Sequence, residues 1–141
     1  MTRQLPPDLE GWIIGYLRGT VLVAEEIDAR VSNKEPAEGD FPATLIIVRD
    51  DGGPSTGLTT STRSIGVSVL AGTRRFDAPA RDLARLLMSW LADDDLPVQG
   101  GRFCPVAAVT DRNGPYTIAE SQDRTRAYFT VEYTVVGSLV E

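Results

Sequence analysis

The sequence predicts an α+β fold, with a mostly antiparallel sheet of four to five strands and helices packed on one face. Three observations lead to this prediction. Residues 124–137 alternate in polarity with the period of two that is typical of a half-buried strand. Residues 77–91 carry an apolar stripe with helical spacing, and residues 44–49 form the apolar run of a central strand. The connections between strands resemble hairpins, so neighbouring strands should run antiparallel.

The strand over residues 124–137 has one apolar and one mixed face. The apolar face consists of Phe129, Val131, Tyr133 and Val135. The other face consists of Tyr128, Thr130, Glu132 and Thr134. Aromatic and β-branched side chains thus occur on both faces, which indicates that one face is covered by another copy of the chain.

The N-terminal third predicts one helix and leaves the next segment open. Two prolines and an aspartate favour a helix N-terminus, and Gly19 is a typical stop, so a helix is predicted over residues 8–18. Residues 20–34 are compatible with a second short helix or with a strand. A helix through Glu26, followed by extended chain over residues 29–32, is the favoured interpretation.

A long hairpin is predicted next. The central strand over residues 44–49 meets an Asp-Asp-Gly-Gly-Pro sequence at residues 50–54, which should break it sharply. Residues 51–63 are polar and without periodicity, which predicts a flexible hairpin loop. Ser64 to Leu70 is predicted as the returning strand.

The last predicted helix is followed by a shorter hairpin. Asp77 is a plausible N-cap of the helix and Pro79 fits its first turn. The apolar stripe consists of Ala80, Leu83, Ala84, Leu87, Trp90 and Leu91. A third strand is predicted over residues 103–110, a turn over residues 111–114 (Asp-Arg-Asn-Gly), and short extended chain over residues 115–118.

Composition narrows the classes of protein to which the chain can belong. A length of 141 residues predicts a single domain spanning residues 1–141, and 42% apolar residues are ordinary for a soluble protein. A net charge of −6 opposes tight wrapping of nucleic acid. The single cysteine, Cys104, is expected to be a small buried side chain rather than a reactive thiol. No signal peptide or membrane-spanning run is evident, so we expect the chain to be made and kept in the cytoplasm, at least at first.

No residue pattern predicts catalysis, a metal site or a bound cofactor. Histidine is absent, which removes the commonest general base and most zinc ligand sets. Asp50-Asp51 and residues 93–95 (Asp-Asp-Asp) adjoin glycine or proline and are best explained as solvated turn residues; a weak cation site is the alternative. Residues 52–57 are rich in glycine but lack the Gly-Lys-Ser/Thr ending of a phosphate loop. The protein is therefore not expected to be an enzyme.

Two arginine pairs and two tryptophans are candidates for contacts with partners. Arg74-Arg75 and the pair Arg124 and Arg126 flank strongly predicted elements, and arginine is enriched at protein interfaces. Trp12 and Trp90 lie on apolar helix stripes and are expected in the core, with a subunit interface as the alternative.

In the order of its elements and the kinds of residue in them, the chain resembles the tail terminator, or tail completion, proteins of long-tailed bacteriophages. The resemblance spans most of the chain but includes no strict signature. It lies in the helix at residues 8–18, the Phe41-Pro42 entry into an apolar strand, the strand end at residues 48–53, the helix at residues 80–87 and the arginine-aromatic strand at residues 126–137. The segment 20–34 and the inserted Asp51 depart from the family's pattern.

The resemblance implies a structural role in the virion, after assembly in the host cytoplasm. Proteins of this family form a ring, typically a hexamer, on the growing end of the tail tube. The ring stops polymerisation and presents a surface to the head's connector protein. The implied partners are other copies of the chain, the tail tube protein and the connector, while DNA only passes through the lumen and no membrane is involved.

Residues expected at the subunit or tube interface are taken from the arginine pairs and the glycine-rich strand end. They are Arg49, Asp51, Gly52, Gly53, Arg63, Arg74, Arg75, Arg124 and Arg126. Three other functions remain open: a head–tail adaptor or connector protein, a small α+β ligand-binding domain or enzyme that uses aspartates, and a monomeric host-directed binding module.

Overall fold

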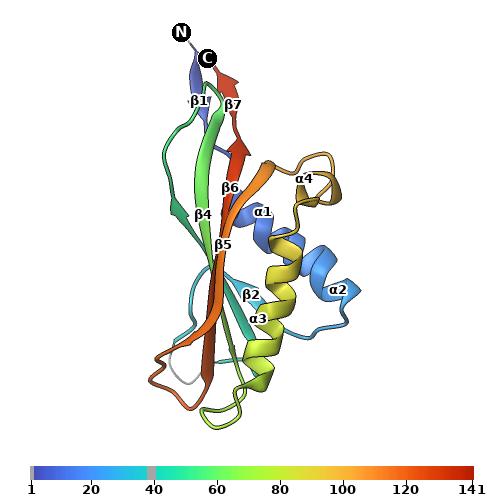
Figure 1. Ribbon diagram of the computed structural model, residues 1–141, viewed down its shortest axis with the longest axis vertical. Helices are drawn as coiled ribbons and strands as arrows, with labels where there is room; N and C mark the ends of the chain where they lie inside the picture. The colour runs from blue at the N-terminus through green and yellow to red at the C-terminus, as the bar shows by residue number, and fades with distance from the viewer. Residues whose placement is uncertain (1, 38–40) are drawn as a thin grey trace.

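The computed structural model describes residues 2–37 and 41–141, which form a main sheet, a small ribbon and a layer of helices (Figure 1). The elements in chain order are β1 (Arg3–Leu5), α1 (Leu9–Tyr16), the π-helical segment η1 (Leu17–Val21), α2 (Leu22–Ala24), β2 (Arg30–Ser32), β3 (Leu45–Gly52), β4 (Thr60–Ala71), α3 (Ala78–Leu91), α4 (Leu96–Gln99), β5 (Val106–Ile118), β6 (Thr125–Val136) and β7 (Ser138–Val140). The five-stranded sheet has the order β2-β3-β4-β6-β5, and β1 pairs with β7 in a separate two-stranded ribbon.

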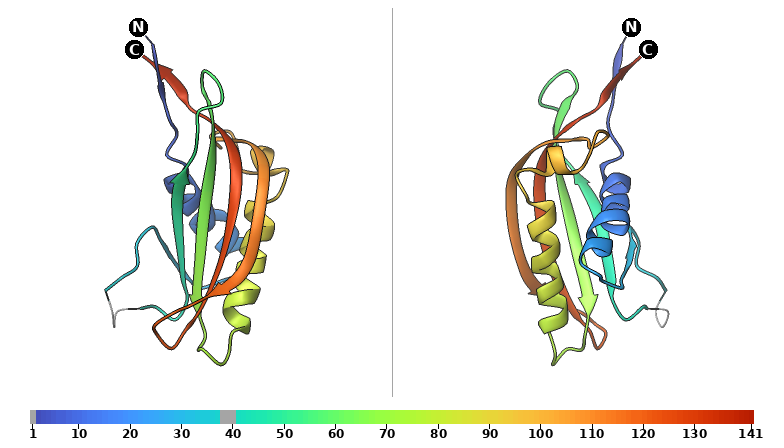
Figure 2. Two further views of the ribbon diagram at one scale, coloured as in Figure 1. Left: turned by 60° about the vertical axis from the view of Figure 1, so that its left-hand side comes forward. Right: turned by 90° about the vertical axis from the view of Figure 1, so that its right-hand side faces the viewer.

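The predicted α+β fold class is confirmed. The helices cover one face of the five-stranded sheet and leave the other face without a helix (Figure 2). All neighbours in this sheet run antiparallel except β2 and β3, which run parallel, so the sheet is mixed. We call the face without helices the open face.

The first helix begins as predicted but does not stop at Gly19. Asp8 precedes α1, and its Oδ1 accepts a hydrogen bond from the Gly11 N–H at 3.0 Å. Gly19 lies inside η1, whose residues Leu17 and Val21 are fully buried. Burial of these side chains outweighs the low helix propensity of glycine. The favoured interpretation of the next segment is largely right, because the chain stays helical to Ala24 and then forms β2.

The long hairpin has a shorter tip than predicted. β3 continues through the Asp-Asp sequence to Gly52, and β4 already begins at Thr60, so the connection spans residues 53–59 rather than 51–63. The register shifts between Asp50 and Gly52, which places Asp51 in a bulge. Gly52 has a φ of 81°, a value that glycine adopts without strain. The bulge thus absorbs the sequence that was expected to break the strand.

The turn predicted at residues 111–114 is wrong. β5 runs without reversal from Val106 to Ile118, and the true reversal follows it at residues 119–124. Gly114 has a φ of 102°, and a Cβ there would lie 2.9 Å from the Tyr128 carbonyl oxygen. The Asn-Gly sequence therefore marks an irregularity of an edge strand, where the register shifts and a following proline is tolerated. The predicted strand also begins too early, since Phe103 lies outside it and is exposed.

The core lies between the sheet and the helices. On β6, the four side chains of the predicted apolar face are all buried. Above them, α3 buries Ala80, Ala84, Leu87 and Leu91, while Leu83 and Trp90 pack half-buried against the edge of the core. Asp77 occupies the N-cap position but makes no capping hydrogen bond; its carboxylate instead lies 3.3 Å from Nη1 of Arg81.

The two tryptophans lie where the helices meet. Trp12 stacks on Tyr16 with ring centroids 5.0 Å apart, and Trp90 meets Tyr16 edge-on at 6.4 Å. Both are partly buried against the core, as expected, and Trp90 also donates a hydrogen bond to Oε1 of Glu25 at 2.9 Å.

Candidate protein-interaction surfaces

The arginines and glycines selected from the sequence do not gather into one site. One set lies at the end of β3 and in the first half of β4, and the other lies near the opposite end of β4, in the loop before α3 and around the start of β6. The two sets thus lie at different positions along the long axis of the sheet (Figure 1). They are therefore two distinct surfaces.

Each aspartate of the Asp50-Asp51 pair has its own arginine. Asp50 is in register with buried Ile65 on the helix-covered side, and its Oδ1 lies 3.9 Å from Nη1 of Arg63. Asp51 lies on the open face, where its Oδ1 accepts a hydrogen bond at 2.9 Å from Nε of Arg49. The second pair is well exposed and contributes little to stability by itself.

The glycines after Asp51 are required by geometry. A Cβ at Gly53 would lie 1.8 Å from the Thr62 carbonyl oxygen, so no other residue fits without a backbone shift. Gly52 has the positive φ described above. Both residues shape the hairpin, and their predicted contact with a neighbouring subunit stays a prediction.

The middle of the open face carries a pair of tyrosines. The rings of Tyr116 and Tyr128 meet edge-on at 5.8 Å, and a Cβ at Gly66 would lie only 2.3 Å from the Tyr128 hydroxyl. Burial and the nearby Asp51 carboxylate raise the pKa of Tyr128, against the opposing effect of Arg49. Tyrosine and arginine are both enriched at protein interfaces.

At the opposite end, Arg74 holds two loops together. Its Nε donates to the Gln122 carbonyl at 2.9 Å, and Nη2 donates to the carbonyls of Ser121 and Glu120 at 2.6 and 3.0 Å. Its backbone N–H donates to Oδ1 of Asp123 at 3.0 Å. The guanidinium is therefore occupied by its own chain.

Arg124 and Arg126 are also engaged within the chain. Arg124 donates to the carbonyls of Pro42 and Ala43, and its guanidinium lies 5.1 Å from the ring centre of Phe41. Arg126 pairs with Glu120 at 2.8 Å and with Glu35 at 2.5 Å.

Glu120 is nearly buried, which by itself would raise its pKa. The hydrogen bond and charge of Arg126, with two backbone N–H donors, outweigh burial and lower the pKa of Glu120. This carboxylate is therefore charged at neutral pH and fastens the 119–124 reversal to the sheet.

Arg75 differs from the other three arginines. It is exposed, and it makes no hydrogen bond or ion pair with any described residue. Its neighbour Phe76 is 61% exposed. This dipeptide is thus the part of the second surface that the chain's own fold leaves unused.

A third surface was not predicted and lies at the end where β1 and β7 project beyond the main sheet (Figure 1). Leu5, Phe103 and Val136 line a groove of about 670 Å³ there, and Phe103 is 84% exposed. The hairpin tip lies beside the ribbon, because the Gly137 N–H donates to the Thr59 carbonyl at 2.7 Å. Exposed Leu58 and Leu139 extend the apolar character along the tip and the ribbon. We call this surface the apolar end.

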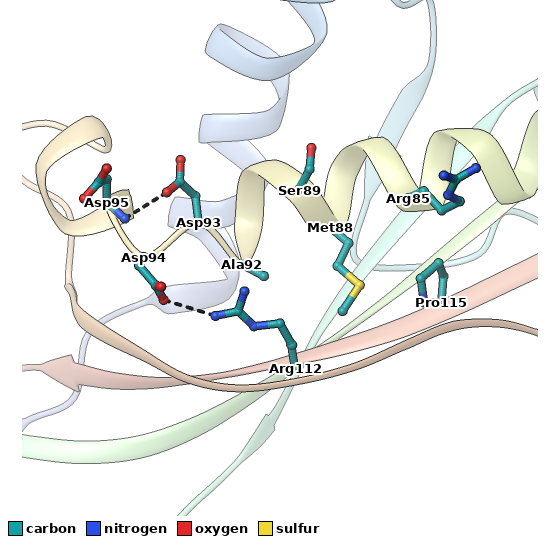
Figure 3. A pocket seen from close by; sticks show the side chains of 9 residues that line it. All are labelled: Arg85, Met88, Ser89, Ala92, Asp93, Asp94, Asp95, Arg112 and Pro115. Atoms are coloured by element: carbon teal, nitrogen blue, oxygen red, sulfur yellow. Dashed lines mark hydrogen bonds and ion pairs between the residues drawn. The ribbon is translucent and has the colours of Figure 1, made fainter.

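A second groove, of about 590 Å³, lies between the end of α3 and β5 (Figure 3). Met88, Ala92 and Pro115 are among its apolar lining, and Asp93, Asp94 and Asp95 lie at one end of it. Nη2 of Arg112 lies 3.1 Å from the Asp94 carboxylate. Oδ1 of Asp93 accepts a hydrogen bond from the Asp95 N–H at 2.9 Å. We call it the α3 groove.

The remaining candidates for chemistry are metal-ligand clusters and the single cysteine. They contain no group of three or more cysteine, aspartate or glutamate side chains placed to hold a metal ion. The Cys104 thiol is half-buried, and burial raises its pKa, so it is mainly protonated at neutral pH. Among the described helices, none combines the length and the hydropathy that crossing a membrane requires.

Comparison with known proteins adds no relative: no family model matches the chain, and no curated protein matches it. The apolar end could not be predicted from the sequence, because Leu5, Leu58 and Phe103 stand singly among polar residues or prolines. Leu5 and Leu58 are adjacent to proline or glycine, and Phe103 lies two residues from each, but such positions are also common in buried turns.

Proposed function

We propose that this protein is a structural assembly protein of a long-tailed bacteriophage, which forms a ring on the tail tube, ends its polymerisation and joins the tail to the head. The observation that carries the proposal is the apolar end. Exposed Leu5, Phe103 and Val136 line one groove there, and exposed apolar side chains that gather on one surface mark a site for a protein partner.

A capping ring needs two kinds of contact, one between copies and one to the tube. A head-to-tail contact between copies closes into a ring and leaves no open end. The apolar end suits the axial contact because it lies at one extremity of the long molecule (Figure 2). The similarity of residues 8–18, 48–53 and 126–137 to the tail terminator family supports the same role.

The charge of the chain fits a ring through which DNA passes. A net charge of −6 disfavours lasting contacts with phosphate, so DNA would slide through such a lumen without being held. Three of the arginines do not oppose this, since Arg74, Arg124 and Arg126 are occupied by carbonyl or carboxylate oxygens of the chain itself.

The proposal is tested by adding the purified protein to the polymerising tail tube protein of the same phage and measuring tube lengths by electron microscopy. Wild-type protein should end growth and appear at one tip of each tube. Phe103→Asp should abolish capping without changing the melting temperature, because the side chain is exposed.

Val23→Asp is the matched control, since Val23 is an exposed apolar residue on α2 and not at the apolar end. It should cap like the wild type. Tubes of unchanged length with wild-type protein would contradict the proposal. Binding to the connector protein without binding to the tube would replace it with the adaptor function.

A further inference from the structure

The loop before α3 presents two side chains on a rigid turn. The Thr73 N–H donates to the Phe76 carbonyl at 3.4 Å, and the Phe76 N–H donates to the Thr73 carbonyl and hydroxyl, each at 3.2 Å. Arg74 fastens the same turn to residues 120–122. Arg75 and exposed Phe76 are therefore held in place without contributing to the core. We call this pair the knob.

The α3 groove has the complementary character. Met88, Ala92 and Pro115 give it apolar lining, Asp93 and Asp95 make one end acidic, and Arg85 lies at the other end, near Pro115 (Figure 3). Arg112 occupies only Asp94, so among the described residues Asp93 and Asp95 have no cationic partner.

These aspartates do not stabilise the helix that they follow. The C-terminus of α3 carries the negative end of the helix dipole, and carboxylates directly after it are unfavourable. The last turn of α3 contains no basic residue to offset them. They directly precede α4, whose N-terminus carboxylates favour, and the exposed Asp95 carboxylate stays open to a cation from a partner.

The knob of one molecule cannot fill the groove of the same molecule. It precedes the first residue of α3, whereas the acidic end of the groove follows the last. A helix of 14 residues is about 21 Å long, which exceeds the reach of an arginine or phenylalanine side chain. A knob could therefore reach such a groove only on a second molecule.

We propose that the knob of one copy enters the α3 groove of a second copy, with Phe76 against Met88 and Pro115 and Arg75 paired with Asp93 and Asp95. This inference rests on the proposed function, because it supplies the contact between copies of the ring. Apolar contact and opposite charge occur together in both partners, which is the complementarity that specific interfaces show. Each copy in a head-to-tail pair keeps one free knob and one free groove, so the contact repeats until the ring closes.

Charge exchange tests the contact through the solution mass, measured by light scattering and native mass spectrometry over a range of concentrations. Arg75→Glu and Asp95→Arg should each weaken association at least about tenfold. The double variant should recover most of the loss, because it restores opposite charges. Lys34→Glu and Asp28→Arg are matched controls that reverse exposed charges elsewhere and should leave the mass unchanged.

Mixing the two single variants gives a sharper result. Arg75→Glu offers an intact groove to the intact knob of Asp95→Arg, and the changed knob and the changed groove again carry opposite charges. The mixture should therefore recover the association that each variant lacks alone. Thermal melts should match the wild type, since both side chains are exposed.

A closed oligomer whose mass is the same in the wild type and in all of these variants would overturn the inference and leave the ring proposal standing. A wild-type protein that stays monomeric at every concentration would overturn the inference as well. In that case the tube-length assay still decides the proposed function on its own.

Discussion

Removing the hydroxyl of Tyr133 tests how α3 is fixed to the sheet. Tyr133 is fully buried on β6, and its hydroxyl donates a hydrogen bond at 2.5 Å to the carbonyl of Leu91, the last residue of α3. Carbonyls in the last turn of a helix lack an intrahelical partner. Tyr133 therefore satisfies an acceptor that would otherwise be buried and unpaired.

Tyr133→Phe deletes one oxygen atom and keeps the ring. A buried carbonyl left without a donor costs about 1–3 kcal/mol. In a domain of this size, each kcal/mol lowers Tm by about 3–4 °C, so a decrease of roughly 3–12 °C is expected. Urea unfolding followed by the fluorescence of Trp12 and Trp90 should show a lower midpoint with an unchanged m value. Tyr116→Phe, on the exposed part of β5, is the control and should have almost no effect.

The pH dependence gives a second measure of the same residue. Burial, with smaller contributions from Cys104 and Tyr16, raises the pKa of Tyr133. The unfolded chain then releases this proton near pH 10 while the folded chain retains it. The stabilisation is fully present below that pH and is lost above it, by about 1.4 kcal/mol per pH unit.

The difference in stability between wild type and Tyr133→Phe should accordingly shrink above about pH 10. An unchanged urea midpoint at neutral pH would refute the proposed role of the hydroxyl. A difference that stays constant to high pH would refute the assignment of the raised pKa.

Three further predictions concern the core, the acid range and two glycines. Leu87→Ala should lower the free energy of unfolding by about 2–5 kcal/mol, measured by urea titration, because the side chain is fully buried. Because the pKa of Glu120 is lowered in the folded state, its charge stabilises the fold above the pKa of the unfolded chain, about 4.3, and this stabilisation is lost as the pH falls through the lower folded pKa. Glu120→Gln should therefore cost about 1–3 kcal/mol at pH 7 and make acid unfolding less steep. An unchanged acid midpoint would exclude the pairing with Arg126. Gly53→Ala should destabilise the protein by about 1–3 kcal/mol, because the new Cβ would collide with a backbone carbonyl. At Gly19 a new Cβ meets nothing within 4 Å, so Gly19→Ala should stabilise the protein by about 0.4–1 kcal/mol. Melting temperatures that shift in the same direction for both variants would contradict this geometry.

The most strongly periodic segments of the sequence predict their structure well. The alternation over residues 124–137 and the stripe over residues 77–91 correspond to β6 and α3, and both bury the expected faces. Here local pattern and tertiary packing agree, since the same side chains define the element and fill the core.

Glycine-containing segments account for the differences. At Gly19 and Gly114 the sequence indicates an ending, yet η1 and β5 continue through these residues, and β3 passes the two aspartates before it ends at Gly52. The reasons are tertiary: buried neighbours hold η1, pairing with β4 holds the bulge of β3, and pairing with β6 holds the irregular β5. A single sequence does not reveal which neighbours a glycine will have.

The candidate surfaces could be predicted only in part. Arginines were expected at an interface, and Arg49 and Arg75 are exposed, so their role stays a prediction. Arg74, in contrast, bonds to carbonyls 46 to 48 residues away, which no local pattern can indicate. The apolar end and the α3 groove likewise arise from segments that meet only after folding.

The order of the central strands has a consequence for how the chain folds. β4 pairs with β6 over twelve residues, but α3, α4 and β5 intervene between them in the chain. Closing this distant pair costs loop entropy before any of its hydrogen bonds form, whereas β5 and β6 are joined by a short reversal. The β5–β6 hairpin is therefore expected to form before β4 pairs with β6. Until β4 pairs, one edge of β6 has free backbone hydrogen-bonding groups and can pair with a strand of another chain. Destabilising the reversal at residues 119–124 should slow refolding in stopped-flow experiments and increase aggregation, whereas changes in the ribbon of β1 and β7 should alter neither.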